Sequence, residues 1–300
     1  MLSRWFGIGF ALAVAGCGAD AEEPADAAQL TPKVLVIGVD GARPDSLIAA
    51  ETPNLDGVAA RGALTTQAST QLTGPTLSGP GWASVLYGVE AAKHQLFGNA
   101  DYEQRDLSYK SFAWQAKQAH GQAIDVSTGW IHILTLLEDD ATEHEYWGGD
   151  ELVSQDMATQ LGTSDAELFF IHFDGVDHAG HATGFAEDNP EYVSAMHDVD
   201  TRVGALLESI AGRATRQSEN WLIIATTDHG GDGENGHGAE IEACQRIWLL
   251  LARDDGALLA LDGASQMDVF PSVLTHLGVA LEPEWQLDGA SRVAALPAPR

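Results

Sequence analysis

Basic residues are scarce in this chain of 300 residues. It has 15 Lys and Arg against 44 Asp and Glu, so its formal net charge is −29. Binding of nucleic acid as a polyanion requires a basic patch, and the sequence contains none. The same charge would repel an anionic substrate, so a site for such a substrate needs bound cations that reverse the field locally.

Cysteines and long apolar runs are scarce as well. The two cysteines are Cys17 and Cys244. The apolar segment at residues 5–14 is too short for a stable membrane span, and no later stretch predicts a transmembrane helix. An apolar content of 45% is nevertheless ample for a packed core. The length fits one large α/β domain or two small ones.

The N-terminus predicts a targeting segment rather than part of the fold. A positive residue, Arg4, precedes the apolar segment, and the sequence Val-Ala-Gly-Cys follows at residues 14–17. This ending resembles the bacterial lipobox. The resemblance implies that residues 1–16 are a lipoprotein signal peptide and that Cys17 is lipidated. An ordinary secretory signal, cut near Ala19 or Ala21, is the alternative.

Residues 17–31 predict a disordered tether, because they are rich in Ala, Asp, Glu and Pro. The residue after Cys17 is Gly18 and not Asp, which resembles outer-membrane rather than inner-membrane sorting. We therefore expect a protein of the bacterial cell envelope, facing the periplasm or the exterior, that contacts the membrane only through a lipid on Cys17. Cys244 is then left without an intramolecular disulfide partner.

The remaining residues, 32–300, alternate between predicted strands and helices. Apolar runs predict buried strands at 33–41, 167–175, 221–227 and 246–252, with further strands at 63–70 and 122–127. Helical patterns occupy 52–62, 82–87, 109–119, 191–213 and 267–277. This alternation predicts an α/β three-layer sandwich, in which helices cover both faces of a mostly parallel sheet. Residues 130–165 are mixed and acidic and could hold a small insertion near the site.

Metal-ligand residue types follow three of these strands. Asp40 follows the first, and Asp-Gly-Val-Asp-His-Ala-Gly-His at 174–181 follows another. In that segment Asp177 and His181 are four residues apart and share one face of a turn or helix, whereas His178 points elsewhere. Asp228, His229 and, in a glycine-rich loop, His237 follow the third. Asp and His side chains suit zinc, and this set suffices for two metal ions. A capping Asp and solvated histidines are the simpler alternative.

A hydroxyl side chain, Ser78, precedes a Gly-Pro-Gly turn that leads into a helix. The N-terminus of a helix favours an anion, although a plain N-cap serine fits the same pattern. Metal coordination would activate Ser78 as a nucleophile, with Thr76 as a second candidate. The amide of Gly79 could stabilise an oxyanion, and Asn99 could line the pocket.

The ordered motifs resemble the alkaline phosphatase superfamily, and within it the type I phosphodiesterase/nucleotide pyrophosphatase and sulfatase-like branches. The series is Asp40, then Ser78 in Ser-x-Pro before a helix, Asp-x-x-Gly-His, Asp-His-Gly and Gly-His-Gly, within a resemblance that covers about residues 33–291. The resemblance implies two divalent metal ions, with zinc expected, and a covalent phospho-enzyme on the serine. One ion would bind Asp40, Asp228, His229 and Ser78, and the other would bind Asp177, His181 and His237.

Two departures from the family pattern bear on the substrate. Phosphodiesterase relatives usually have Thr as nucleophile followed shortly by Asn, where this chain has Ser78 and Gly81. Sulfatases require an Arg for formylglycine formation at the position of Trp82, and their calcium site prefers oxygen ligands. We therefore expect hydrolysis of small phosphate esters, diesters ahead of monoesters, with sulfatase activity weaker. A non-catalytic metal-binding lipoprotein and a phosphoryl transferase are the other hypotheses.

Overall fold

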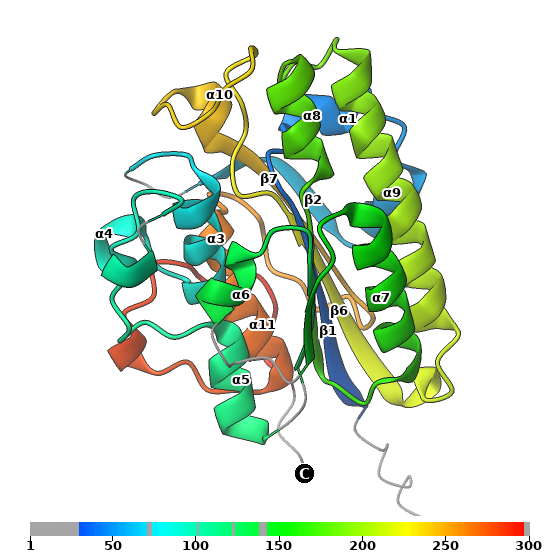
Figure 1. Ribbon diagram of the computed structural model, residues 1–300. Coiled ribbons are helices and arrows are strands. Elements are labelled where there is room, and N and C mark those ends of the chain that lie inside the picture. The colour runs from blue at the N-terminus through cyan, green and yellow to red at the C-terminus, as the bar shows by residue number, and fades with distance from the viewer. Residues whose placement is uncertain (1–29, 71–73, 101, 122–123, 138–142, 297–300) are drawn as a thin grey trace, which may run out of the picture.

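The computed structural model describes residues 30–70, 74–100, 102–121, 124–137 and 143–296 (Figure 1). The expected signal peptide, the lipidation site Cys17 and the tether up to residue 29 lie outside the described residues. Within the described part of the chain, none of the helices is both long enough and apolar enough for a membrane span. The first strand already begins at Thr31, the last residue of the expected tether.

A seven-stranded sheet forms the central layer, in the order β2-β7-β6-β1-β5-β3-β4. β7 is antiparallel to both of its neighbours, and the other pairings are parallel. This confirms the mostly parallel sheet of an α/β fold. The strands are β1 (Thr31–Val39), β2 (Ala63–Ser69), β3 (Ile124–Thr128), β4 (Glu143–Tyr146), β5 (Leu168–Phe173), β6 (Glu219–Thr226) and β7 (Arg246–Arg253).

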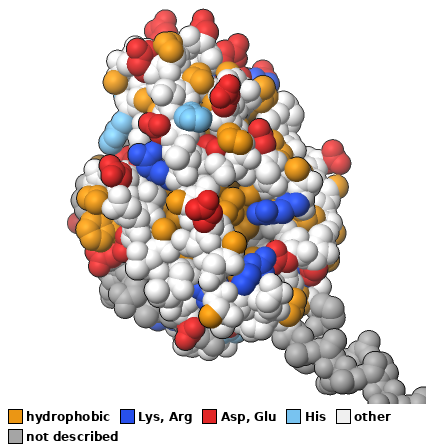
Figure 2. Space-filling view, turned by 90° about the vertical axis from the view of Figure 1, so that its right-hand side faces the viewer, with side chains coloured by type: hydrophobic (Ala, Val, Ile, Leu, Met, Phe, Trp, Pro, Cys, Tyr) orange, Lys and Arg blue, Asp and Glu red, His pale blue; other side chains and the backbone are white. Residues whose placement is uncertain are grey.

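Helices cover both faces of the sheet (Figure 1). The helices are α1 (Pro44–Ala49), α2 (Pro53–Ala60), α3 (Ser78–Tyr87), α4 (Ala91–His94), α5 (Phe112–His120), α6 (His132–Leu137), α7 (Asp150–Thr163), α8 (Gly175–Thr183), α9 (Pro190–Ala211), α10 (Glu242–Gln245) and α11 (Val269–Leu277). α3, α5, α6 and α11 pack on one face, and α2, α7 and α9 on the other. The α7/α9 side is shown in Figure 2, where basic side chains stand apart among acidic and apolar ones.

Two apolar cores form because the central strand is buried on both faces. Val34 and Val36 of β1 belong to the core beneath α3 and α11, whereas Leu35 and Ile37 belong to the core beneath α7 and α9. This alternation follows from the two-residue period of a strand. It also explains why β1 reads as a continuous apolar run, as expected for a parallel strand between two layers of helices.

The segment 130–165, for which the sequence suggested a small insertion, contributes α6, β4 and α7 to the sheet and its helical layers. β4 extends the sheet at its edge and runs parallel to β3. α7 packs against α9, β3 and β5. β4 is four residues long and lies within acidic sequence, so it lacks the apolar run that made the central strands visible.

The N-terminus of α2 is capped by a residue of α9. Thr52 occupies the N-cap position but makes no side-chain capping hydrogen bond. The buried carboxylate of Asp200 instead accepts hydrogen bonds from the backbone amides of Asn54, at 3.1 Å, and Leu55, at 2.8 Å. One carboxylate thereby satisfies two of the free N–H groups of the helix and joins α2 to α9.

We predict that Asp200→Ala destabilises the protein by about 1.5–3 kcal/mol, because it removes hydrogen bonds to a charged group and leaves buried amides unpaired. Denaturant unfolding measures the change. Asp198→Ala, at an exposed position of the same helix, is the matched control and should shift the free energy of unfolding by less than about 0.5 kcal/mol. Equal stability of the two variants would contradict the capping role.

Candidate metal centre and nucleophile

The polar residues expected to form the site come together at one edge of the sheet. β1 lies between β6 and β5, and all three run in the same direction. Their carboxyl ends therefore place Asp40, Asp177 and Asp228 side by side, at the edge where open α/β sheets bind ligands. The sequence predicted this meeting of strand ends, and the structure shows it.

One group consists of Asp40, Asp228 and His229, all buried. Nε2 of His229 lies 3.4 Å from Oδ1 of Asp40 and 3.4 Å from Oδ2 of Asp228. The hydroxyl of Ser78 adjoins the same atoms, with Oγ 3.3 Å from Oδ1 of Asp40 and 3.4 Å from Nε2 of His229. The expected nucleophile thus lies within the first expected ligand set.

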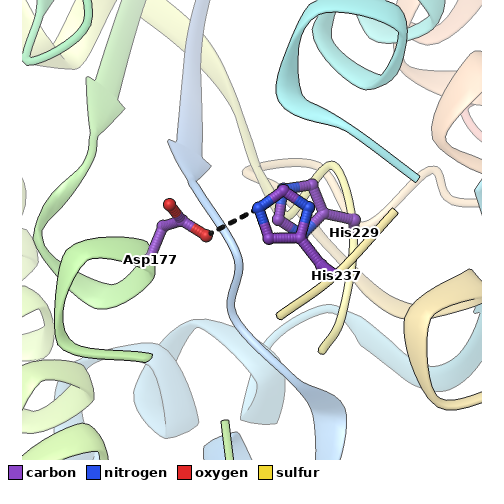
Figure 3. Close-up of side chains that lie close together, drawn as sticks. All are labelled: Asp177, His229 and His237. Carbon is purple, nitrogen blue, oxygen red and sulfur yellow. Dashed lines mark ion pairs between the residues drawn. The ribbon is translucent and has the colours of Figure 1, made fainter. Parts of the chain in front are cut away.

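A second group consists of Asp177, His181 and His237. Nε2 of His181 lies 3.3 Å from Oδ2 of Asp177, and Nε2 of His237 lies 3.6 Å from Oδ1 of Asp177. The two imidazole Nε2 atoms are 3.1 Å apart. The rings of His229 and His237 stack with centroids 3.8 Å apart, opposite Asp177 (Figure 3). The two groups are therefore in contact with each other.

Backbone carbonyls fix the orientation of the three histidines. In His229, Nδ1 lies 2.8 Å from the carbonyl oxygen of Gly230. In His237, it lies 2.8 Å from the carbonyl oxygen of Thr76. In His181, it lies 2.9 Å from the carbonyl oxygen of Asn235. A carbonyl only accepts, so the Nδ1 proton is donated to it. In a neutral ring Nε2 then has a lone pair directed at the carboxylates, which is the arrangement of histidines that bind metals.

These distances fit a divalent metal such as zinc. Ligands about 2.1 Å from a tetrahedral ion lie about 3.4 Å from one another. The contacts in the two groups range from 3.1 to 3.6 Å. Two Nε2 lone pairs that face each other also repel unless a proton or a cation separates them. Oδ1 of Asp177 is buried and accepts no hydrogen bond within the described part of the chain, so it too is available as a ligand.

Burial and mutual repulsion shift the pKa values of this cluster. Burial, with the charge of Asp40, raises the pKa of Asp177 to about 7 and raises that of Asp228 well above its usual range. Burial would also raise the pKa of Asp40, but hydrogen bonds from His172 and His229 hold it well below its usual range. Burial lowers the pKa of His229, yet the charge of Asp228 and a hydrogen bond to Asp40 raise it to about 10. Without a cation, the cluster therefore retains protons.

The helix that carries Ser78, the expected nucleophile, begins at the site. Ser78 is the first residue of α3, and Leu77 occupies the N-cap position, so Ser78 is not the N-cap serine that the sequence left as an alternative. Thr76, the second nucleophile candidate, is engaged elsewhere, because its hydroxyl accepts from the amide of Gly238 and donates to the carbonyl of Ala239. A Cβ on Gly81 would come within 2.9 Å of Cβ of Asp228, so glycine there lets α3 approach the segment that follows β6.

The two residues expected to bind substrate contact each other. The amide of Gly79 donates to Oδ1 of Asn99 at 2.8 Å, so this amide is already paired. A Cβ on Gly79 would lie 2.8 Å from the carbonyl oxygen of Gly98. Asn99 is thereby held at the N-terminus of α3, next to Ser78. The contact supports a place for Asn99 at the site, and it leaves the oxyanion role of Gly79 an untested expectation.

Four residues of the site were not assigned a role there by sequence reasoning. Trp82 and His172 both contact Asp40, whose Oδ2 is 2.8 Å from Nε1 of Trp82 and 3.1 Å from Nε2 of His172. Asp174 lies with Asp40 and Asp177 in a third carboxylate group. Asp150 accepts from the amides of Asp174 and Gly175 and so caps α8. His172 lies two residues before the segment 174–181 and Asp174 is its first residue, so both are close to a sequence signal. Nothing near Asp150 in the sequence signals its role.

Comparison with known proteins places the chain in a family. The family model for type I phosphodiesterase/nucleotide pyrophosphatase matches residues 34–153 and 136–270. A curated relative, GPI ethanolamine phosphate transferase 3 of Schizosaccharomyces pombe, is 25% identical over 137 residues, which cover 44% of this chain and 14% of the relative. The chain thus spans only a small part of that protein.

Solved structures share the fold. A 2-O GAG sulfatase superposes with a TM-score of 0.67 at 12% identity, covering 87% of this chain and 73% of the sulfatase. Murine ectonucleotide pyrophosphatase/phosphodiesterase 5, solved as an inactive variant with AMP, gives a TM-score of 0.56 at 22% identity. The superposition covers 66% of this chain and 57% of the murine one. With the family model matching most of its length, the chain belongs to the type I phosphodiesterase/nucleotide pyrophosphatase family.

Proposed function

We propose that this protein hydrolyses phosphate diesters with Ser78 as the nucleophile and two zinc ions as cofactors. The observation that favours it most is the position of Ser78 Oγ, 3.3 Å from Asp40 and 3.4 Å from His229, at the first residue of a helix. A nucleophile, a set of metal ligands and a helix N-terminus that favours anions together suit displacement at phosphorus.

In this proposal Asp40, Asp228 and His229 hold one ion beside Ser78, and Asp177, His181 and His237 hold the other. Bound zinc would offset the negative charge of the site and lower the pKa of a hydroxyl that it ligates. Ser78 would lose its hydroxyl proton and attack phosphorus in line, so that the Oγ–P bond forms as the bond to the leaving oxygen breaks and the leaving group takes up a proton. Water would then attack the resulting serine phosphodiester, so that the Oγ–P bond breaks, Oγ regains a proton and the phosphate monoester is released.

Charge favours a diester over a monoester. The site gathers four carboxylates, Asp40, Asp174, Asp177 and Asp228, and two divalent ions would neutralise them without excess. A diester brings one negative charge, whereas a monoester brings about two near neutral pH. Arg43, whose guanidinium reaches the glycine-rich loop, is already paired with Asp45 and with the carbonyl of Gly231. The net charge of −29 disfavours a dianion further.

Ser78→Ala tests the nucleophile. The variant should lose turnover by about three orders of magnitude or more while it retains both metals, because the hydroxyl forms the covalent bond. Turnover of bis(p-nitrophenyl) phosphate and metal content by mass spectrometry are the measurements. Ser84→Ala removes a second buried hydroxyl of α3 and should leave turnover near that of the parent. Unchanged turnover in Ser78→Ala would overturn the role of Ser78. Bound zinc without turnover in the parent protein would favour a metal-binding lipoprotein.

Substrate charge provides a second test. At full metal loading, kcat/KM should be at least about tenfold higher for bis(p-nitrophenyl) phosphate than for p-nitrophenyl phosphate. Added salt should narrow this gap, because it screens repulsion of the dianion. A faster monoester, or faster p-nitrophenyl sulfate, would overturn the diester assignment. Turnover that requires an added acceptor alcohol would instead favour a transferase, the class to which the name of the Schizosaccharomyces pombe relative, an ethanolamine phosphate transferase, refers.

Zinc binding should release protons. In the metal-free protein the pKa of His229 is raised to about 10 and that of Asp177 to about 7, so near pH 7 the first is protonated and the second retains part of its proton. Zinc must displace these protons, so its apparent affinity should fall as pH is lowered from 8 to 6. Calorimetry in buffers of different ionisation enthalpy should show more than one proton released at pH 7.

Two variants test which residues release the protons, one as the test and the other as its control. Asp177→Asn removes a group that retains a proton and should lower the number released. His237→Ala should weaken binding without changing that number, because burial lowers the pKa of His237 to about 4 and the ring has no proton to lose at pH 7. An affinity that is flat between pH 6 and 8, with no proton release, would contradict the assignment of these residues as ligands.

A further inference from the structure

Asp40 is held from two sides. Its Oδ1 is the atom that faces Ser78 and His229, at 3.3 and 3.4 Å. Its Oδ2 accepts from Nε1 of Trp82 at 2.8 Å and lies 3.1 Å from Nε2 of His172. Asp40 is 1% exposed, and Trp82 and His172 are both fully buried, so water does not compete for these contacts.

The contact with Trp82 follows from the geometry of α3. Ser78 and Trp82 are four residues apart, so they lie on the same face of the helix one turn from each other. The carboxylate of Asp40 lies along this face, with Oδ1 at Ser78 and Oδ2 at Trp82. The helix that places the nucleophile therefore also sets the rotation of the carboxylate.

The position of Trp82 is itself fixed by the sheet. Its indole lies across β1 at Gly38, where a Cβ would come within 2.5 Å of the ring. Gly38 pairs with His172 of β5 in the parallel register. The rings of Trp82 and His172 meet edge to face, with centroids 4.8 Å apart. The two N–H groups thus reach Oδ2 from a rigid, fully packed pair of side chains.

The second ring nitrogen of His172 is also engaged. Its Nδ1 lies 3.3 Å from the hydroxyl oxygen of Thr128, which accepts from the amide of Trp130 and lies 2.9 Å from the carbonyl oxygen of that residue. When Nε2–H is donated to Asp40, Nδ1 of the neutral ring accepts the hydroxyl proton of Thr128. His172 is thereby tied to the end of β3 as well as to β1 and α3. Its ring cannot turn away from Asp40 without breaking this second contact.

We propose that Trp82 and His172 are positioning residues that clamp Oδ2 of Asp40 with two N–H groups and thereby leave Oδ1 alone to serve the metal and Ser78. An unrestrained carboxylate can offer either oxygen, or both, to a metal ion. The clamp makes Asp40 a ligand through one fixed oxygen. Hydrogen bonds of this kind orient metal ligands, and their loss typically costs about 10- to 100-fold in metal affinity or activity. The inference rests on the proposed metal site and nucleophile.

Three variants test the clamp in the full-length protein. Trp82→Phe keeps an aromatic ring but removes the N–H, and His172→Leu fills the space of the imidazole without a donor. Each should accelerate the loss of one of two bound zinc ions to a chelator by about 10- to 100-fold and lower kcat more than it changes KM. His172→Gln returns an amide N–H near the position of Nε2 and should restore most of both properties. The double variant Trp82→Phe/His172→Leu should lose less than the product of the single losses, because both donors serve one oxygen.

His276→Leu is the matched control for the loss of a buried histidine. Nε2 of His276 lies 2.9 Å from the carbonyl oxygen of Asn220, at the opposite end of β6 from the site. This variant should lose thermal stability while zinc release and kcat remain those of the parent. The clamp is refuted if Trp82→Phe and His172→Leu release zinc at the parental rate, or if their losses merely follow thermal stability as in His276→Leu. Zinc release needs no turnover, so it tests the clamp even if the proposed reaction is wrong.

Discussion

The mutual repulsion of buried carboxylates is the constraint on which the rest of the site depends. Asp40, Asp174 and Asp177 have oxygens within 4.8 Å of one another, and Asp228 adjoins Asp40. Buried like charges are strongly unfavourable unless protons or cations neutralise them. The fold keeps them together because each follows, or lies on the helix that follows, a central strand whose position is set by two apolar cores. The large stabilisation from the cores thus opposes the electrostatic cost at the strand ends.

Hydrogen bonds with backbone groups orient several of the side chains at the site. Carbonyls orient His181, His229 and His237, and the amide of Gly41 donates to Oδ1 of Asp228. Glycine is required where the segments approach most closely. Gly41 has a φ of +64°, and a Cβ there would come within 2.5 Å of Oδ1 of Asp177. A chain with few basic side chains therefore builds its site from carboxylates, imidazoles and peptide groups, and in the proposed function cations from solution supply the positive charge.

Much of this could be predicted from the sequence, for a physical reason. Asp40 and Asp228 follow long apolar runs, and parallel strands deliver their carboxyl ends to one edge, so their meeting follows from local pattern alone. The contacts that depend on tertiary packing could not be predicted in this way. The sequence marked Trp82 only as a departure from the sulfatase pattern, because its contact with Asp40 depends on the register of Gly38 against His172. Asp150 and Asp200 cap helices distant in sequence, which no local signal reveals.

The two ligand groups differ in exposure, and this difference sets the direction of access. The side chains of Asp40, Asp228 and His229 are at most 1% exposed, whereas that of His181 is 46% exposed. Asp177 and His237 are only 9% and 6% exposed, so His181 is the expected ligand most open to solvent. In the proposed reaction, an ester that enters past His181 would meet Ser78 at the inner end of its path, and in-line attack would direct the leaving group back toward solvent.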